Sequence, residues 1–144
     1  MPMFSRIEEI NAIRELKSEL SEKERILTEP IMTDLDMIST LYMWFRDIVS
    51  EKEAFRPGNV SLRKKFLFIV LYLYSPSSLA GGKVRNGLRK KITEVLGLAS
   101  ETTLSDNRNG LVFAYRMYKY FRQDVERIYT EIVNRLKHEG IINQ

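Results

Sequence analysis

The sequence contains no cysteine and only one histidine, His138. Without cysteine the chain can form neither a disulfide nor a thiolate metal site, and it has no thiol nucleophile. A single histidine cannot form a histidine cluster, so carboxylates would be the only side-chain ligands for a structural metal ion. These absences fit a reducing compartment, and we expect a cytoplasmic protein that carries no cofactor and no metal.

Long apolar runs are also absent. The longest, residues 66–74, follows Lys64 and Lys65 directly and has about half the length that a bilayer span needs. The first ten residues carry acids where a signal peptide has a basic start before an apolar run. The sequence therefore predicts neither a membrane span nor a secretory leader, and it predicts that residues 66–74 form a buried helix.

Only 4 prolines and 7 glycines interrupt the 144 residues. Between them, apolar residues recur every three or four positions, which predicts helices and no strands. We expect helices over residues 4–27, 34–49, 61–74 and 83–96, and a long amphipathic helix from Leu111 to the C-terminus. The helix at 61–74 is apolar on nearly every side, which predicts a central position. The expected fold class is all-α, a helical bundle that begins with an N-terminal helical hairpin.

Charge is divided unevenly along the chain. The net charge is +4, but residues 1–56 hold 8 basic and 12 acidic side chains (net −4), whereas residues 57–144 hold 15 basic and 7 acidic (net +8). This division predicts an acidic hairpin for dimerisation or partner contact, followed by a basic domain that meets an anionic partner. A homodimer and a separate protein partner both remain open. The expected interface residues of the hairpin are Ile7, Ile10, Ile13, Leu16, Leu20 and Trp44.

Residues 90–111 contain the most informative local pattern. A helix ends at Leu96 and Gly97, a polar turn follows, and Thr102 or Thr103 opens a second helix whose first buried position is Leu104. This arrangement resembles the helix-turn-helix unit of DNA-binding domains in general, without pointing to one family. Leu104 comes one residue later than in the common pattern, which predicts a different angle between the two helices.

The resemblance implies a partner of double-stranded DNA, and the residue types suit that role. Hydroxyls and cations bind phosphates, while Asn and Arg side chains pair with base edges in the major groove. Arg85 and Arg89 are expected one turn apart on the polar face of the first motif helix. The expected phosphate contacts are Lys83, Arg85, Arg89, Lys90, Lys91, Thr102 and Thr103. The expected base contacts are Ser105, Asn107, Arg108 and Asn109.

The first functional hypothesis is therefore a DNA-binding protein, a bacterial or phage regulator of transcription or a replication-associated factor. The second hypothesis is a non-enzymatic helical structural or adaptor protein of a phage particle or another assembly. Two short serine-acyltransferase signatures occur, beginning at Ser61 and Ser105, but the third element of that set is missing. We expect no enzyme.

An aromatic run near the C-terminus allows two interpretations, a base-stacking platform interleaved with Arg116, Lys119 and Arg122, or core positions. Its aromatic residues are Phe113, Tyr115, Tyr118, Tyr120 and Phe121. Helical spacing places Tyr115, Tyr118 and Phe121 on one stripe with Leu111, which predicts core positions. Phe113 and Tyr120 fall on a different side of that helix. The sequence does not decide the cognate site, the choice among DNA, RNA and acidic protein, the oligomeric state, or whether residues 105–110 are helix or loop. A bent helix is the favoured interpretation for 105–110.

Overall fold

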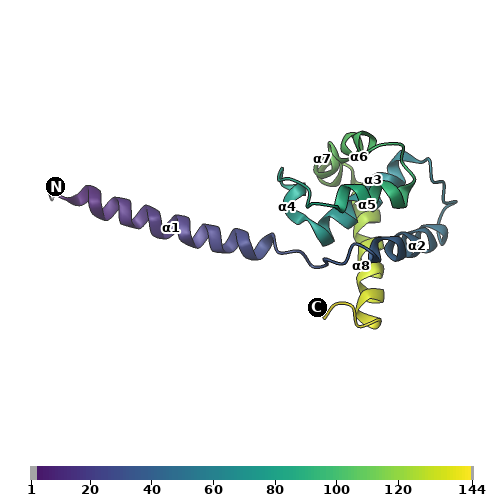
Figure 1. Ribbon diagram of the computed structural model, residues 1–144, viewed down its shortest axis with the longest axis horizontal. Coiled ribbons are helices and arrows are strands. Elements are labelled where there is room, and N and C mark those ends of the chain that lie inside the picture. The colour runs from purple at the N-terminus through teal and green to yellow at the C-terminus, as the bar shows by residue number, and fades with distance from the viewer. Residues whose placement is uncertain (1–2, 144) are drawn as a thin grey trace.

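The computed structural model describes residues 3–143, which form eight helices and contain no strand. The expected all-α helical bundle is confirmed. Figure 1 shows a compact body from which one long helix projects. In chain order the helices are α1 (Ser5–Leu27), α2 (Met37–Ser50), α3 (Val60–Tyr74), α4 (Pro76–Leu79), α5 (Leu88–Leu96), α6 (Glu101–Arg108), α7 (Leu111–Met117) and α8 (Lys119–His138).

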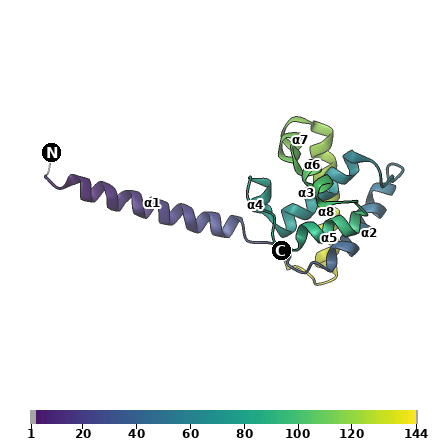
Figure 2. The same cartoon turned by 45° about the horizontal axis from the view of Figure 1, so that its top comes forward.

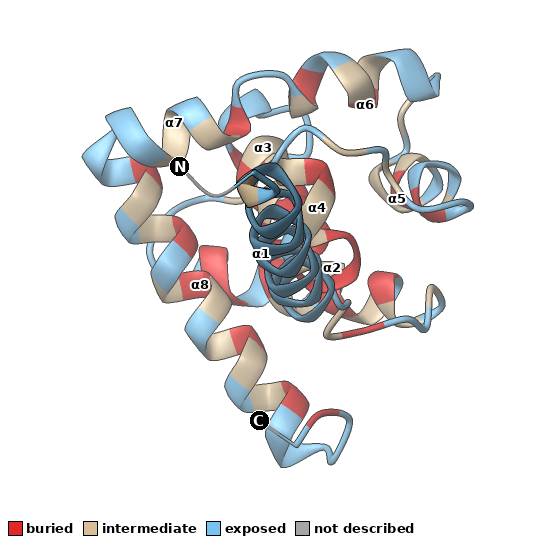
Figure 3. Cartoon of the chain, turned by 90° about the vertical axis from the view of Figure 1, so that its left-hand side faces the viewer, coloured by how far each residue is buried: buried red, intermediate tan, exposed pale blue. Residues whose placement is uncertain are grey.

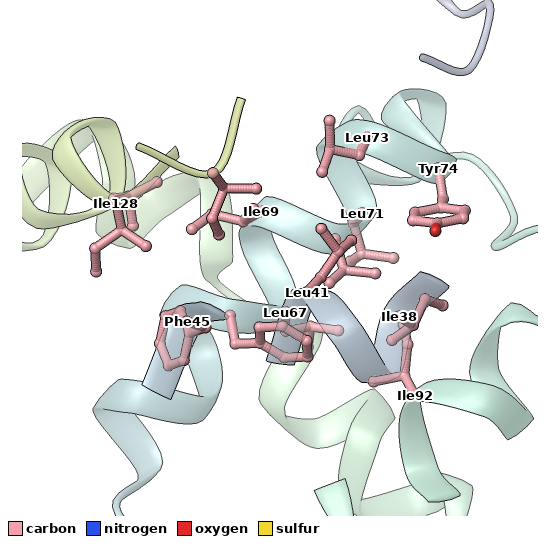
Figure 4. Packing of buried hydrophobic residues seen from close by; sticks show 14 of the residues in the cluster. Ile38, Leu41, Phe45, Leu67, Ile69, Leu71, Leu73, Tyr74, Ile92 and Ile128 are labelled. Carbon is pink, nitrogen blue, oxygen red and sulfur yellow. The ribbon is translucent and has the colours of Figure 1, made fainter. Parts of the chain in front are cut away.

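Helix α3 occupies the centre of the body, as its apolar composition predicts. Its two ends are set by local chemistry. The Asn59 side chain accepts a hydrogen bond from the Leu62 N–H at 3.1 Å and caps the first turn. Pro76 opens the single turn α4 directly after the helix. Between these ends α3 packs against α2, α5, α6 and α8, and Figure 4 shows side chains of α2, α3, α5 and α8 meeting in the core.

The predicted N-terminal hairpin is not formed. Helix α1 buries no residue, and it extends away from the body in both Figure 1 and Figure 2. Helix α2 belongs to the core instead, where it buries Ile38, Leu41 and Phe45 among others and packs against α8, α5 and α3. These later helices cover the apolar face of α2. Helix α2 therefore has no uncovered apolar face on which α1 could pack. The break in the chain therefore falls after α1 rather than at residue 56.

The segment after α1 is bound to the end of α3. The N–H groups of Ile31 and Met32 both donate to the Leu73 carbonyl oxygen, at 2.9 and 3.0 Å. The Tyr74 hydroxyl donates to the Asp34 carbonyl oxygen at 2.6 Å. Carbonyls in the last turn of a helix have no partner within the helix, and here the incoming segment supplies two donors to one of them.

The helix predicted at 83–96 begins five residues late, at Leu88. Gly87 precedes it with φ +80°, a left-handed conformation that L side chains rarely adopt. A Cβ built at Gly87 would lie 3.3 Å from Cδ1 of Leu35, so the segment before α2 packs closely against this turn. Lys83 and Arg85 therefore lie in a loop, and Arg85 does not share a helical face with Arg89.

The long C-terminal helix and the bent helix predicted before it are both divided. Asn109 and Gly110 separate α6 from α7, with Gly110 at φ +80°. Tyr118 then adopts an extended conformation, φ −106° and ψ +105°, between α7 and α8. One straight helix over residues 111–136 would be about 39 Å long, which would carry one end far beyond the core. The break allows α7 to pack against α8 and buries both Leu111 and Phe121.

Candidate functional site

Helices α5 and α6 pack against each other and are joined by a tight turn. Gly97 ends α5 with φ +68°. The Gly97 N–H donates to the Glu94 carbonyl at 3.1 Å and the Leu98 N–H donates to the Thr93 carbonyl at 3.0 Å, the pair of hydrogen bonds that defines a Schellman motif. Leu104 is buried, as predicted. The two helices and the glycine turn that the sequence predicts are therefore present.

Most of the cations predicted to hold phosphates contact protein groups. Arg89 donates to the Ser105 hydroxyl, and the ammonium group of Lys91 lies 3.8 Å from the Asp36 carboxylate. A guanidinium nitrogen of Arg85 donates to the Tyr74 carbonyl at 3.4 Å. Within the described part of the chain, Lys83 and Lys90 make no hydrogen bond or ion pair, and both are exposed. Two of the five predicted cations are thus fully available to an anion.

The residues predicted to read base edges face mainly inward. Asn107 is only 8% exposed, and its Nδ2 donates to the Thr103 carbonyl at 2.6 Å. Arg108 donates to the Gly82 carbonyl at 3.5 Å, beside a hollow lined by apolar side chains of α3. Ser105 accepts from Arg89 and donates to the Glu101 carbonyl at 3.2 Å. Asn107, predicted to contact a base, is therefore buried. Ser105 and Arg108 are half-buried, and their contact with bases stays a prediction.

This inward orientation follows from how α6 packs on α3. Residues three or four apart share one face of a helix, so burying Leu104 also turns Asn107 and Arg108 toward the body. The exposed residues of α6 include Glu101, Thr102 and Asp106, and the two carboxylates among them would repel phosphate. Of the predicted base contacts only Asn109 is exposed; Thr103, predicted to hold a phosphate, is half-buried.

Among the described helices, α1 holds the most exposed large apolar side chains. Every residue from Arg6 to Leu27 is exposed, and Figure 3, in which α1 points toward the viewer, colours it as exposed along its length. Its predicted interface residues are between 45% and 63% exposed, namely Ile7, Ile10, Ile13, Leu16 and Leu20. None of these five side chains is buried by other residues of the described range 3–143.

Trp44, the sixth predicted interface residue, lies apart from α1. It is half-buried against the core, and the guanidinium group of Arg135 on α8 lies 6.0 Å from the centre of its ring. Arg135 also approaches the Asp47 carboxylate at 3.9 Å. Trp44 therefore helps to hold α2 against α8, and the structure does not bring it together with the α1 stripe.

A second exposed cluster includes three residues of the aromatic run near the C-terminus. Tyr118 was expected in the core, but the break between α7 and α8 leaves it 59% exposed. Phe113 and Tyr120, expected on a different side, are exposed as well. The sequence has no acid between Asp106 and Asp124. This one-sided charge around the aromatic run is the sequence feature that could have indicated an exposed, basic surface. Tyr115 and Phe121 do contact α3, where their rings meet Phe68 with centres 5.1 and 6.4 Å apart.

One hollow lies between α3, α7 and α8. It measures about 270 Å³, and Tyr115 closes one side by donating its hydroxyl to the Glu126 carboxylate at 2.7 Å. This hydrogen bond, together with desolvation and the neighbouring negative charge, raises the pKa of Tyr115. The lining residues are Phe68, Ile69, Tyr72, Tyr115, Val125, Glu126 and Tyr129. The hollow offers aromatic surface and one carboxylate, with no paired nucleophile and base.

No helix among residues 3–143 is long and apolar enough to cross a membrane. Over the same residues, no group of three or more His, Cys, Asp or Glu side chains could hold a metal ion. Comparison with known proteins adds no family, because no family model matches the chain and no curated protein or solved structure is significantly similar to it.

Proposed function

We propose that this protein is a non-enzymatic helical assembly protein, whose copies join through α1 while the compact body of residues 31–142 forms the other surfaces. One observation carries the proposal. A helix of 23 residues projects from the body with an uncovered apolar stripe and buries nothing. Most helical stability in proteins comes from packing an amphipathic face rather than from intrinsic propensity. A partner that covers the apolar face of α1 would therefore stabilise this helix.

The charges of α1 favour a second copy of the same helix as that cover. The helix carries 5 basic and 6 acidic side chains, so it nearly neutralises itself and would not bind strongly to a highly charged surface. A second copy presents both signs of charge at similar spacing and can pair with the first. The basic residues are Arg6, Arg14, Lys17, Lys23 and Arg25, and the acidic residues are Glu8, Glu9, Glu15, Glu19, Glu22 and Glu24.

The second half of α1 has the spacing of a helix-helix seam. Ile13, Leu16, Leu20 and Leu27 are separated by three, four and seven residues, as are the a and d positions of a heptad repeat. The helix is about 35 Å long, which is long enough for this seam but short for a stable isolated coiled coil. We therefore expect association that depends on protein concentration.

The test is the mass of the full chain in solution, measured by sedimentation equilibrium over a range of concentrations. The parent should exceed the 16.9 kDa of one chain, and Leu16→Glu/Leu20→Glu should remain at that mass. In a dimer this change removes four leucines from the interface. At about 1.5 kcal/mol each, the dissociation constant should rise about 10⁴-fold.

A matched control adds the same charge to the same helix away from the seam. Ser18→Glu/Ser21→Glu changes two exposed residues on the opposite side of α1 and should associate like the parent. A parent that stays at the mass of one chain at every concentration would contradict the proposal. So would a seam variant that associates as well as its control.

A second candidate function is binding of duplex DNA through its phosphates. Residues 83–93 contain five cations and no acid, and Lys83 and Lys90 are exposed. Lys83→Gln/Lys90→Gln should reduce the slope of log affinity against log salt by about 1.8, whereas Lys52→Gln/Lys137→Gln, with equal charge loss elsewhere, should not. Competition between duplexes at fixed salt then measures sequence preference. If the salt slope is unchanged in the first variant, this candidate is rejected.

A further inference from the structure

The turn from α7 into α8 presents a compact group of exposed aromatic and basic side chains. Helix α7 ends at Met117, Tyr118 is extended, and α8 begins at Lys119. Much of this turn is coloured as exposed beside the α7 label in Figure 3. We call this group the α7–α8 corner, and it consists of Phe113, Arg116, Met117, Tyr118, Lys119 and Tyr120.

The aromatic rings of the corner are exposed because the backbone bends there. Tyr118 is 59% exposed, Phe113 is 57% exposed and Tyr120 is 80% exposed. The rings of Phe113 and Tyr118 meet edge to face, with centres 6.0 Å apart and planes at 84°. Met117 lies one helical turn after Phe113, on the same face of α7. Such exposed rings are costly in water and available to a partner.

The charged residues of the corner itself have one sign. Arg116 and Lys119 are exposed, and no acid occurs between Asp106 and Asp124. Asp124 itself is engaged, because the ammonium group of Lys65 donates to its carboxylate at 2.8 Å. A partner that covers the corner therefore meets aromatic faces and uncompensated positive charge together, which favours a polyanion with apolar faces of its own.

From this combination we propose that the α7–α8 corner binds single-stranded nucleic acid, with bases stacked on Tyr118, Tyr120 and Phe113 and phosphates held by Arg116 and Lys119. Unpaired bases expose the faces that aromatic rings stack on, whereas a duplex hides them. A membrane surface fits less well, because α7 has seven residues, too few for a continuous apolar stripe, and two of the three rings carry hydroxyls. The recognition is of rings and phosphates, so it is independent of base sequence.

The experiment measures binding of the full chain to a fluorescent 15-nucleotide single strand of mixed sequence, by anisotropy, against the matching duplex. The single strand should bind at least about tenfold more tightly. Tyr118→Ala/Tyr120→Ala leaves the net charge unchanged and should weaken single-strand binding about 5-fold or more for each ring. Tyr118→Phe/Tyr120→Phe keeps both rings and should bind like the parent.

A second pair of variants tests the phosphate contacts. Arg116→Gln/Lys119→Gln should reduce the slope of log affinity against log salt by about 1.4, and the control Lys52→Gln/Lys137→Gln should not. Equal affinity for strand and duplex, no binding of the single strand, or unchanged binding by the alanine variant would each overturn the proposal. So would binding of vesicles of phosphatidylserine and phosphatidylcholine that the alanine variant loses while it still binds the single strand.

The inference does not depend on association through α1. The same measurements on the Leu16→Glu/Leu20→Glu background separate the two, because that variant should lose the assembled mass and retain the effect of each ring. Thermal unfolding of every variant verifies that the exposed substitutions leave the fold intact.

Discussion

The buried amide of Asn107 yields the sharpest prediction for the α6 helix. Its Nδ2 donates to the Thr103 carbonyl at 2.6 Å, and its Oδ1 is buried without a hydrogen-bond partner among the described residues. In Asn107→Asp an acceptor replaces the donor, so a negatively charged carboxylate oxygen faces the Thr103 carbonyl oxygen inside the protein. The lost hydrogen bond contributes about 1 kcal/mol, and an unpaired buried charge costs more. We expect the free energy of unfolding to fall by about 3 kcal/mol at pH 7.

Asn107→Leu should behave in the opposite way. Leucine is similar in size, and it removes the unpaired Oδ1 together with the donor. Recovering about 1–3 kcal/mol of desolvation offsets the lost hydrogen bond, so this variant should be as stable as the parent or slightly more stable. The asparagine is thus expected to tolerate an apolar replacement better than an acidic one.

Urea unfolding followed by circular dichroism measures both variants, and an unchanged slope against urea verifies that the same transition is compared. The deficit of Asn107→Asp should shrink toward about pH 4, where the carboxyl takes up a proton. An Asn107→Asp variant as stable as the parent at pH 7 would refute the reasoning, because it would place this side chain in water, where it could contact a base.

Two further predictions concern the turn before α6 and the end of α3. Gly97→Ala should lower the free energy of unfolding by about 1 kcal/mol through backbone strain alone, because φ is +68° and no neighbouring side chain or backbone lies within 4 Å of the added Cβ. Gly58→Ala is the control, because Gly58 also lies in open space but has no positive φ. Urea unfolding of both variants should show a smaller loss of stability for Gly58→Ala. Burial, and secondarily the charge of Asp34, raises the pKa of Tyr74. The folded-state pKa of Tyr74 therefore exceeds its unfolded-state value. The stability that the neutral Tyr74 contributes is present below about pH 10 and is lost as the pH rises further. Melting temperatures between pH 8 and pH 11 should therefore fall less steeply in Tyr74→Phe than in the parent, and equal slopes would contradict this assignment.

The spacing of apolar residues predicted the fold correctly where a helix buries a single apolar face against the core. Ile38, Leu41 and Phe45 recur at three and four residues, and all three are buried. The same rule cannot say what covers a face. The stripe of α1 was therefore expected to meet α2, although no residue of α1 is buried by the described part of the chain. It also cannot detect a break that leaves the spacing intact, as at Tyr118, where the period continues through an extended residue.

The candidate site was predicted less well, for a physical reason that Asn107 and Arg89 illustrate. Polar side chains in a helix with few apolar residues were expected to face solvent. Asn107 instead satisfies its donor inside the body, and Arg89 bonds to Ser105 across the two motif helices. Such hydrogen bonds depend on how the two helices are placed relative to each other, which spacing along one chain does not contain.

The hydrogen bonds from Ile31 and Met32 to the Leu73 carbonyl have a mechanical consequence. They fasten the root of α1 to the end of the most deeply buried helix. A force applied along α1 is thus transmitted to the core through the hydrogen-bonded segment that contains Ile31 and Met32. If copies are joined through antiparallel pairing of this helix, its length of about 35 Å sets the spacing between neighbouring bodies, and shortening α1 by whole turns should bring them closer in steps of about 5.4 Å.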